Sequence, residues 1–105
     1  MNRLEQLKVM SAEDPNDSFI RFAIAMEYKT DENFEEAISF FEKLKELDAK
    51  YIGLYYHLAE CYVEMEDEKK ALTIYKEGIK LAEDQNDQHA KAELMNAKVN
   101  LEMGL

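Results

Sequence analysis

The fold is decided by a stretch that occurs twice, as residues 24–47 (IAMEYKTDENFEEAISFFEKLKEL) and, 34 positions later, as residues 58–81 (LAECYVEMEDEKKALTIYKEGIKL). Small and aromatic residues recur at the same places in both copies. The matched pairs are Ala25 with Ala59, Tyr28 with Tyr62, Ala37 with Ala71, Phe41 with Tyr75 and Leu47 with Leu81. A fixed period of this size is typical of proteins built from stacked supersecondary units.

The same offset extends over most of the 105 residues. Toward the N-terminus, Leu4 and Leu7 correspond to Ile38 and Phe41. Toward the C-terminus the match is weak, and it pairs Tyr55 with His89 and Leu58 with Ala92. The repeat therefore predicts one domain over residues 1–105.

Apolar residues within each period are spaced by threes and fours, which indicates amphipathic helices. The spacing predicts six helices near residues 2–12, 17–30, 33–47, 52–65, 68–83 and 86–102. Asn33 is expected to cap a helix together with Glu36 as a capping box, and Pro15 is expected to end the first helix. Three glycines and one proline leave few tight turns for a sheet. The fold class is therefore all-α.

The two copies resemble the tetratricopeptide repeat (TPR), a 34-residue helix–turn–helix unit. The residues that carry the resemblance are Ile24, Ala25, Tyr28, Phe34, Ala37 and Phe41 in the first copy and Tyr55, Leu58, Ala59, Tyr62, Ala71, Tyr75 and Gly78 in the second. The copies depart from the family pattern in seven places. Arg21 and Glu68 replace aromatic residues, and Leu44 replaces a small one. Glu32 and Glu66 stand where glycine is common, and Ala49 and Glu83 stand where proline is usual.

The resemblance implies a right-handed α-solenoid of about six antiparallel helices. Its parts are repeat one (18–51), repeat two (52–85), an N-terminal capping helix (2–12) and a C-terminal helix (86–102). A solenoid end needs a polar outer face. We expect Lys91, Glu93, Lys98 and Glu102 to form that face on the C-terminal helix.

The charge balance excludes several partners. Thirteen basic against 23 acidic residues give a net charge of −10, which disfavours nucleic acid and anionic membrane. The single cysteine, Cys61, suits a reducing compartment. We expect no signal peptide, and the sequence has no apolar stretch near the roughly 20 residues of a membrane span. A soluble cytoplasmic protein is therefore expected.

Catalytic and metal-binding patterns are weak. His57 and Cys61 lie one helical turn apart, but a zinc site needs four ligands and there is no second cysteine. Residues 14–17 and 84–87 resemble the start of a calcium loop yet lack its later glycine and glutamate. The three serines lie in no nucleophile motif. We expect no enzyme, no metal and no cofactor.

In TPR proteins the first helix of each pair lines a concave groove, so the resemblance implies a peptide-binding site there. The candidate residues are Phe19, Phe22, Met26, Tyr56, His57, Glu60 and Glu64, and the C-terminal helix is expected to add Ala90, Lys91, Leu94 and Lys98. Phe22 and Tyr56 occupy positions of the Lys/Asn/Arg clamp that holds chaperone C-termini, so that function is not expected. The strip favours an apolar or amphipathic protein or peptide partner, with or without basic flanks.

Two other interpretations remain open. The C-terminal helix could cover Phe19 and Phe22 as core, because large exposed apolar patches are rare in monomers. Alternatively, the apolar surface could pair two copies in a homodimer, which would make the chain a self-assembling structural module without a separate peptide ligand. An enzyme or metal protein ranks third.

Overall fold

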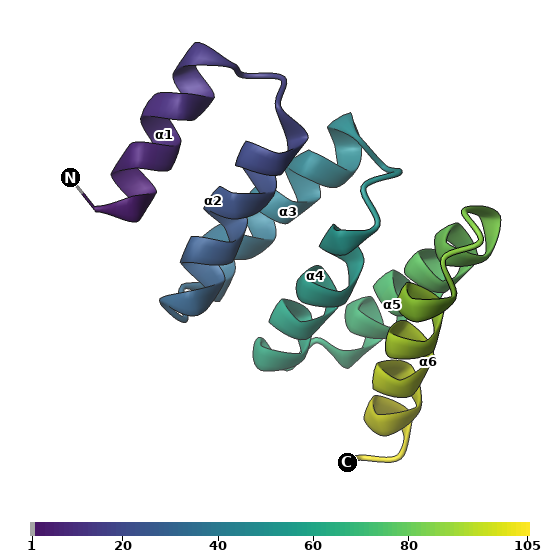
Figure 1. Cartoon of the computed structure of the whole chain (residues 1–105). Coiled ribbons are helices and arrows are strands. Elements are labelled where there is room, and N and C mark those ends of the chain that lie inside the picture. Colours follow the sequence, from purple (N-terminus) through teal and green to yellow (C-terminus); the bar gives the residue numbers. More distant parts are fainter. Residues whose placement is uncertain (1) are drawn as a thin grey trace. The chain divides into compact units, whose positions relative to one another are not determined.

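The computed structural model describes residues 2–105, and this part of the chain contains six α-helices and no strand (Figure 1). The helices are α1 (Arg3–Glu13), α2 (Ser18–Thr30), α3 (Phe34–Leu47), α4 (Gly53–Glu64), α5 (Glu68–Asp84) and α6 (Gln88–Glu102). Each boundary lies within two residues of the one predicted from the apolar spacing. The all-α fold with six helices is confirmed.

The contacts divide the chain into two compact units. Unit 1 ends at Tyr51, and in it α1 and α3 both pack against α2. Unit 2 begins at Ile52, and in it α4 and α6 both pack against α5, with a smaller contact between α4 and α6. Each unit therefore has a helix pair from one repeat plus one additional helix.

The core of unit 1 forms where small residues let α2 and α3 approach. Ala25 and Ala37 are fully buried, and Phe41 and Leu44 fill the space beside them. Close helix packing requires small side chains at such crossings. Leu47, which the apolar spacing places on the same face of α3, is instead 53% exposed at the last residue of the helix.

The core of unit 2 follows the same plan. Ala59 and Ala71 are fully buried between α4 and α5, as are the large side chains of Leu54 and Leu58. Cys61 is also fully buried, as is common for a free cysteine. The repeated alanines thus mark the helix crossing in both units.

The turn inside each repeat is a Schellman motif with a left-handed residue. Glu32 (φ 60°) follows α2 and Glu66 (φ 61°) follows α4. The next backbone N–H donates back to the carbonyl of Tyr28 in one turn and of Tyr62 in the other, both at 2.9 Å. Glycine adopts this left-handed conformation readily, whereas each glutamate adopts it at a cost in free energy.

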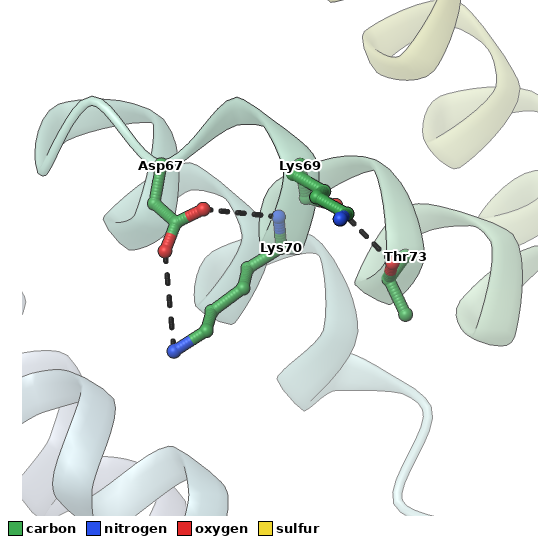
Figure 2. Close-up of polar contacts among 4 residues, drawn as sticks. All are labelled: Asp67, Lys69, Lys70 and Thr73. Atoms are coloured by element: carbon green, nitrogen blue, oxygen red, sulfur yellow. Dashed lines mark hydrogen bonds and ion pairs between the residues drawn. The ribbon is translucent and has the colours of Figure 1, made fainter.

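Side chains cap the following helices. Figure 2 shows Asp67, whose carboxylate accepts a hydrogen bond from the backbone N–H of Lys70 at 3.2 Å and lies 3.9 Å from Lys70 Nζ. One turn further on, Thr73 Oγ1 donates to the carbonyl of Lys69 at 3.1 Å. Capping by an aspartate or asparagine satisfies a backbone donor that has no partner in the helix. The same bond begins α1, α2, α3 and α6.

The capping box expected at Asn33 forms only in part. The Asn33 side chain accepts from the N–H of Glu36 at 3.4 Å. The backbone N–H of Asn33, which Glu36 would have to engage, donates instead to the carbonyl of Tyr28. The Schellman turn therefore takes the donor that the second half of the box requires.

The weak C-terminal extension of the repeat is wrong. At offset 34, His89 and Ala92 would be buried like Tyr55 and Leu58, yet both are exposed. The reason is that α5 continues three residues beyond the position equivalent to the end of α3 and ends in another left-handed turn, at Asn86 (φ 57°). Helix α6 thus follows α5 through the turn used inside a repeat, and it presents a different face to its neighbours.

Candidate functional site

The described part of unit 2 contains a pocket of 210 Å³ between α4, α5 and α6. Three predicted residues, Tyr56, Glu60 and Glu64, lie one helical turn apart along α4 and line this pocket. The rest of the lining consists of Val63, Tyr75, Ala97, Asn100, Leu101 and Leu105. The pocket therefore combines an acidic, aromatic wall on α4 with a mostly apolar wall on α6.

The α6 wall was missed by the sequence analysis, which placed Ala90, Lys91, Leu94 and Lys98 there. Leu94 is 1% exposed and belongs to the core. Lys91 and Lys98 line a different groove, between α5 and α6. The error follows from the register of α6, because the turn at Asn86 rotates this helix relative to the 34-residue pattern.

Two tyrosines in the pocket hold their protons strongly. Tyr56 has a raised pKa because of its burial, the nearby charge of Glu60, a side-chain hydrogen bond to Glu60 and the charge of Glu93. Burial, Glu60 and Tyr56 together raise the pKa of Tyr75 to about 12. Both phenols are therefore hydrogen-bond donors at neutral pH. The pocket can hold a polar backbone or a cation beside apolar side chains.

His57 lies on the same helix but is not among the pocket-lining residues. Its ring packs edge-on against Tyr56, with ring centroids 5.4 Å apart, and its Nδ1 lies 3.7 Å from Glu60 Oε1. Within residues 2–105, no group of three or more His, Cys, Asp or Glu residues is arranged to hold a metal ion. His57 thus supports the position of the Tyr56 and Glu60 side chains.

The other three candidate residues lie on α2 in unit 1. Phe19 is 63% exposed, and Met26 is half-buried. Phe22 is half-buried too, with ring centroids 6.0 Å from Phe41 and 5.2 Å from Tyr51. Phe22 therefore packs on the core of unit 1, whereas Phe19 offers most of its ring to a ligand.

The outer face of α6 is polar only in part: Glu93 and Glu102 are exposed as expected, whereas Lys91 and Lys98 are not. Met95, Val99 and Met103 are 45%, 46% and 67% exposed, and Lys91 and Lys98 are half-buried. The rotation of α6 after the turn at Asn86 also explains why Met95, Val99 and Met103 are exposed. No helix in residues 2–105 combines the length and the apolar character needed to cross a membrane.

Comparison with known proteins identifies the family. Residues 19–102 match the family described as regulator of microtubule dynamics protein 1-3. A TPR domain protein of Salinibacter ruber is 37% identical, with a TM-score of 0.80 over 85% of this chain and 90% of its own. None of the curated proteins matches at a significant level.

Two further solved structures share the fold. A protein from Bordetella parapertussis has a TM-score of 0.88 at 21% identity, over 99% of this chain and 90% of its own. YrrB, described as a TPR protein with an unusual peptide-binding site, has a TM-score of 0.77 at 25% identity, over 90% of this chain and 46% of its own. The chain is a TPR protein, and it belongs to the family of regulator of microtubule dynamics protein 1-3.

Proposed function

We propose that the chain is a non-catalytic interaction module, an adaptor or scaffold, that binds an apolar or amphipathic peptide or helix. The proposed binding residues of unit 1 are Phe19, Phe22 and Met26 on α2, and those of unit 2 are Tyr56, His57, Glu60 and Glu64 on α4. TPR folds generally serve as interaction modules rather than catalysts, and YrrB is named for a peptide-binding site. We further infer a cytoplasmic location from the lone, buried Cys61.

The observation that carries the proposal is the pocket in unit 2. It brings Tyr56, Glu60 and Glu64 together with Leu101 of α6 around one cavity. Ligand sites are typically concave and mostly apolar, with a few well-placed polar groups. Here the apolar part suits an aliphatic side chain, and the Tyr75 hydroxyl suits a peptide carbonyl, because the Tyr56 hydroxyl already donates to Glu60.

The charge of the pocket selects among peptides. Glu60 and Glu64 are carboxylates on one wall, in a chain of net charge −10. Opposite charge accelerates encounter and suppresses wrong partners more than it adds affinity. The preferred ligand is therefore an amphipathic peptide with Lys or Arg flanks.

The test uses fluorescence anisotropy with a labelled amphipathic peptide that carries Lys flanks, compared with the same core carrying Glu flanks. Tyr56→Ala and Phe19→Ala should each weaken binding by more than about 1 kcal/mol, because buried aromatic anchors dominate interface energies. Leu47→Ala is the control, since it removes an exposed apolar side chain outside the candidate site. Equal affinity for both peptides, or an unchanged affinity after Tyr56→Ala, would contradict the proposal.

Self-assembly is the second candidate function, favoured by the exposed Met95, Val99 and Met103 of α6. A homodimer through this face would bury them without any separate ligand. Sedimentation analysis over a range of concentrations tests it. A dimer that persists in Tyr56→Ala and dissociates in Met95→Ser/Met103→Ser would assign the assembly to α6.

The family name provides a candidate process. A role in microtubule dynamics predicts that the purified chain changes the polymerisation rate of tubulin in a turbidity assay. The Tyr56→Ala variant would lose this effect if the α4 pocket mediates it, and an unchanged rate with the native chain would exclude a direct effect.

A further inference from the structure

A second hollow of 370 Å³ lies between α5 and α6, on a different side of α6 from the α4 pocket. Ile79, Met95 and Val99 provide its apolar surface. Four lysines surround these side chains, two from each helix: Lys76 and Lys80 from α5, and Lys91 and Lys98 from α6. We call this hollow the lysine groove.

The charge of the lysine groove is opposite to that of the chain. The chain has 13 basic residues and a net charge of −10, yet four of those basic residues line this groove beside a single carboxylate, Glu83. A local positive site on an acidic protein attracts an anionic ligand to one place, because the remaining surface repels it.

Half of these lysines are available to a ligand. Lys80 pairs with Asp84 at 3.5 Å and Lys98 with Glu102 at 3.0 Å. Lys76 and Lys91 form no ion pair within residues 2–105. These two stand on different helices, so carboxylates of a ligand could engage both sides of the groove at once.

We propose that the lysine groove binds an acidic amphipathic peptide segment of a partner protein. Apolar side chains of the segment would lie on Met95 and Val99, which are each almost half exposed. Its carboxylates would pair with Lys76 and Lys91. Methionine adapts to varied apolar shapes, and a helix can bind in such a groove through residues spaced by threes and fours. This site is additional to the α4 pocket, which favours basic flanks.

The experiment measures binding of a labelled synthetic helix with Leu on one face and Glu on the other to the full chain. Two comparison peptides have Lys in place of Glu or Ser in place of Leu. We expect the Leu/Glu peptide to bind through the lysine groove, weakened by salt, whereas binding of the Lys peptide should depend on Tyr56 and not on Lys76 or Lys91. We also expect a loss of about tenfold or more in Lys76→Glu/Lys91→Glu, because rim charges now repel the ligand. Met95→Ser tests the apolar part separately.

The matched control is Lys43→Glu/Lys69→Glu, which changes the net charge equally at lysines outside the groove. If the control and groove variants lost the same affinity for the Leu/Glu peptide, the effect would come from the net charge of the chain. That result would overturn the proposal. Undiminished binding of the Ser peptide would also overturn it. The proposal would also be overturned if the chain bound no peptide but formed a groove-dependent homodimer. The same holds if it bound no peptide but sedimented with phosphatidylserine vesicles.

Tyr56→Ala separates this site from the proposed function. We expect Tyr56→Ala to retain the Leu/Glu peptide while losing the peptide with Lys flanks. If only one of the two peptides fails to bind as expected, the result therefore identifies which of the two proposed sites is wrong. Circular dichroism of every variant verifies that the helices remain folded.

Discussion

Gly78 on α5 lies so close to Tyr55 on α4 that a Cβ atom at position 78 would stand 2.8 Å from the Cβ of Tyr55 and 3.0 Å from Leu94 Cδ1. The positions 34 residues earlier are Arg21 and Leu44. In repeat one, α3 has the large, fully buried Leu44, and Arg21 on α2 donates a hydrogen bond to the backbone carbonyl of Pro15. Repeat one therefore has a large buried side chain at the position on its second helix where repeat two has a glycine.

Gly78→Ala should lower the free energy of unfolding by roughly 1–2 kcal/mol. Overpacking of a tight core costs about 1–3 kcal/mol, and the better helix propensity of alanine recovers roughly 0.5–1 kcal/mol. Urea denaturation followed by circular dichroism measures the difference. Thr73→Ala, at an exposed site on the same helix, is the control, and a Gly78→Ala variant as stable as that control would mean that α4 and α5 are further apart.

Glu66→Gly should stabilise the chain by roughly 0.5–1 kcal/mol, because glycine adopts φ near 61° without steric cost. Glu32→Gly should behave in the same way at φ 60°. Asn86→Gly should gain less, since asparagine tolerates the left-handed region better than glutamate. Thermal and urea unfolding of the three variants give the ranking, and a larger gain at Asn86 would contradict the strain argument.

Phe22→Ala should destabilise unit 1 by about 2 kcal/mol, somewhat less than the 3–5 kcal/mol of a fully buried Phe→Ala change, because the ring is only half-buried. Its contacts with Phe41 and Tyr51 are lost in the variant. Phe19→Ala should change stability by less than about 0.5 kcal/mol. Chemical denaturation measures the free energy of unfolding of both variants. If Phe19→Ala leaves it nearly unchanged, Phe19 is the better position for testing ligand binding. Equal losses of stability in the two variants would contradict this prediction.

Alkaline pH should destabilise unit 2 through Tyr75. Its pKa is about 12 in the folded state against 10 as the ordinary value, so between these pH values the unfolded chain loses a proton that the folded chain keeps. Stability from this group is complete below pH 10 and declines as the pH rises toward 12. Tyr75→Phe should flatten the decline, as measured by urea midpoints across this pH range. An equally steep decline in the Phe variant would assign the effect to other groups.

The sequence predicted the helices and the cores because their signal is local and periodic. Ala25, Ala37, Ala59 and Ala71 are all buried at helix crossings. The face that α6 presents to its neighbours could not be predicted from the periodicity. It depends on where α5 stops, and the left-handed turn at Asn86 has the same sequence character as any polar loop.

The candidate site was predicted in part for the same reason. Tyr56, Glu60 and Glu64 share a helix face at fixed spacing, and that spacing alone places them around one pocket. The opposite wall, including Asn100 and Leu101, depends on the rotation of α6. The packing of Phe22 on Tyr51 joins residues from α2 and the segment after α3, which periodicity within one helix does not reveal.

Because Cys61 is buried, its reaction with a thiol reagent can be used to measure local opening of unit 2. The side chain is fully covered on α4, and the sequence holds no other thiol. A thiol reagent can modify the native protein only when the packing around α4 opens. The labelling rate therefore measures the opening equilibrium of unit 2 without any engineered probe, while unit 1 contributes nothing to the signal.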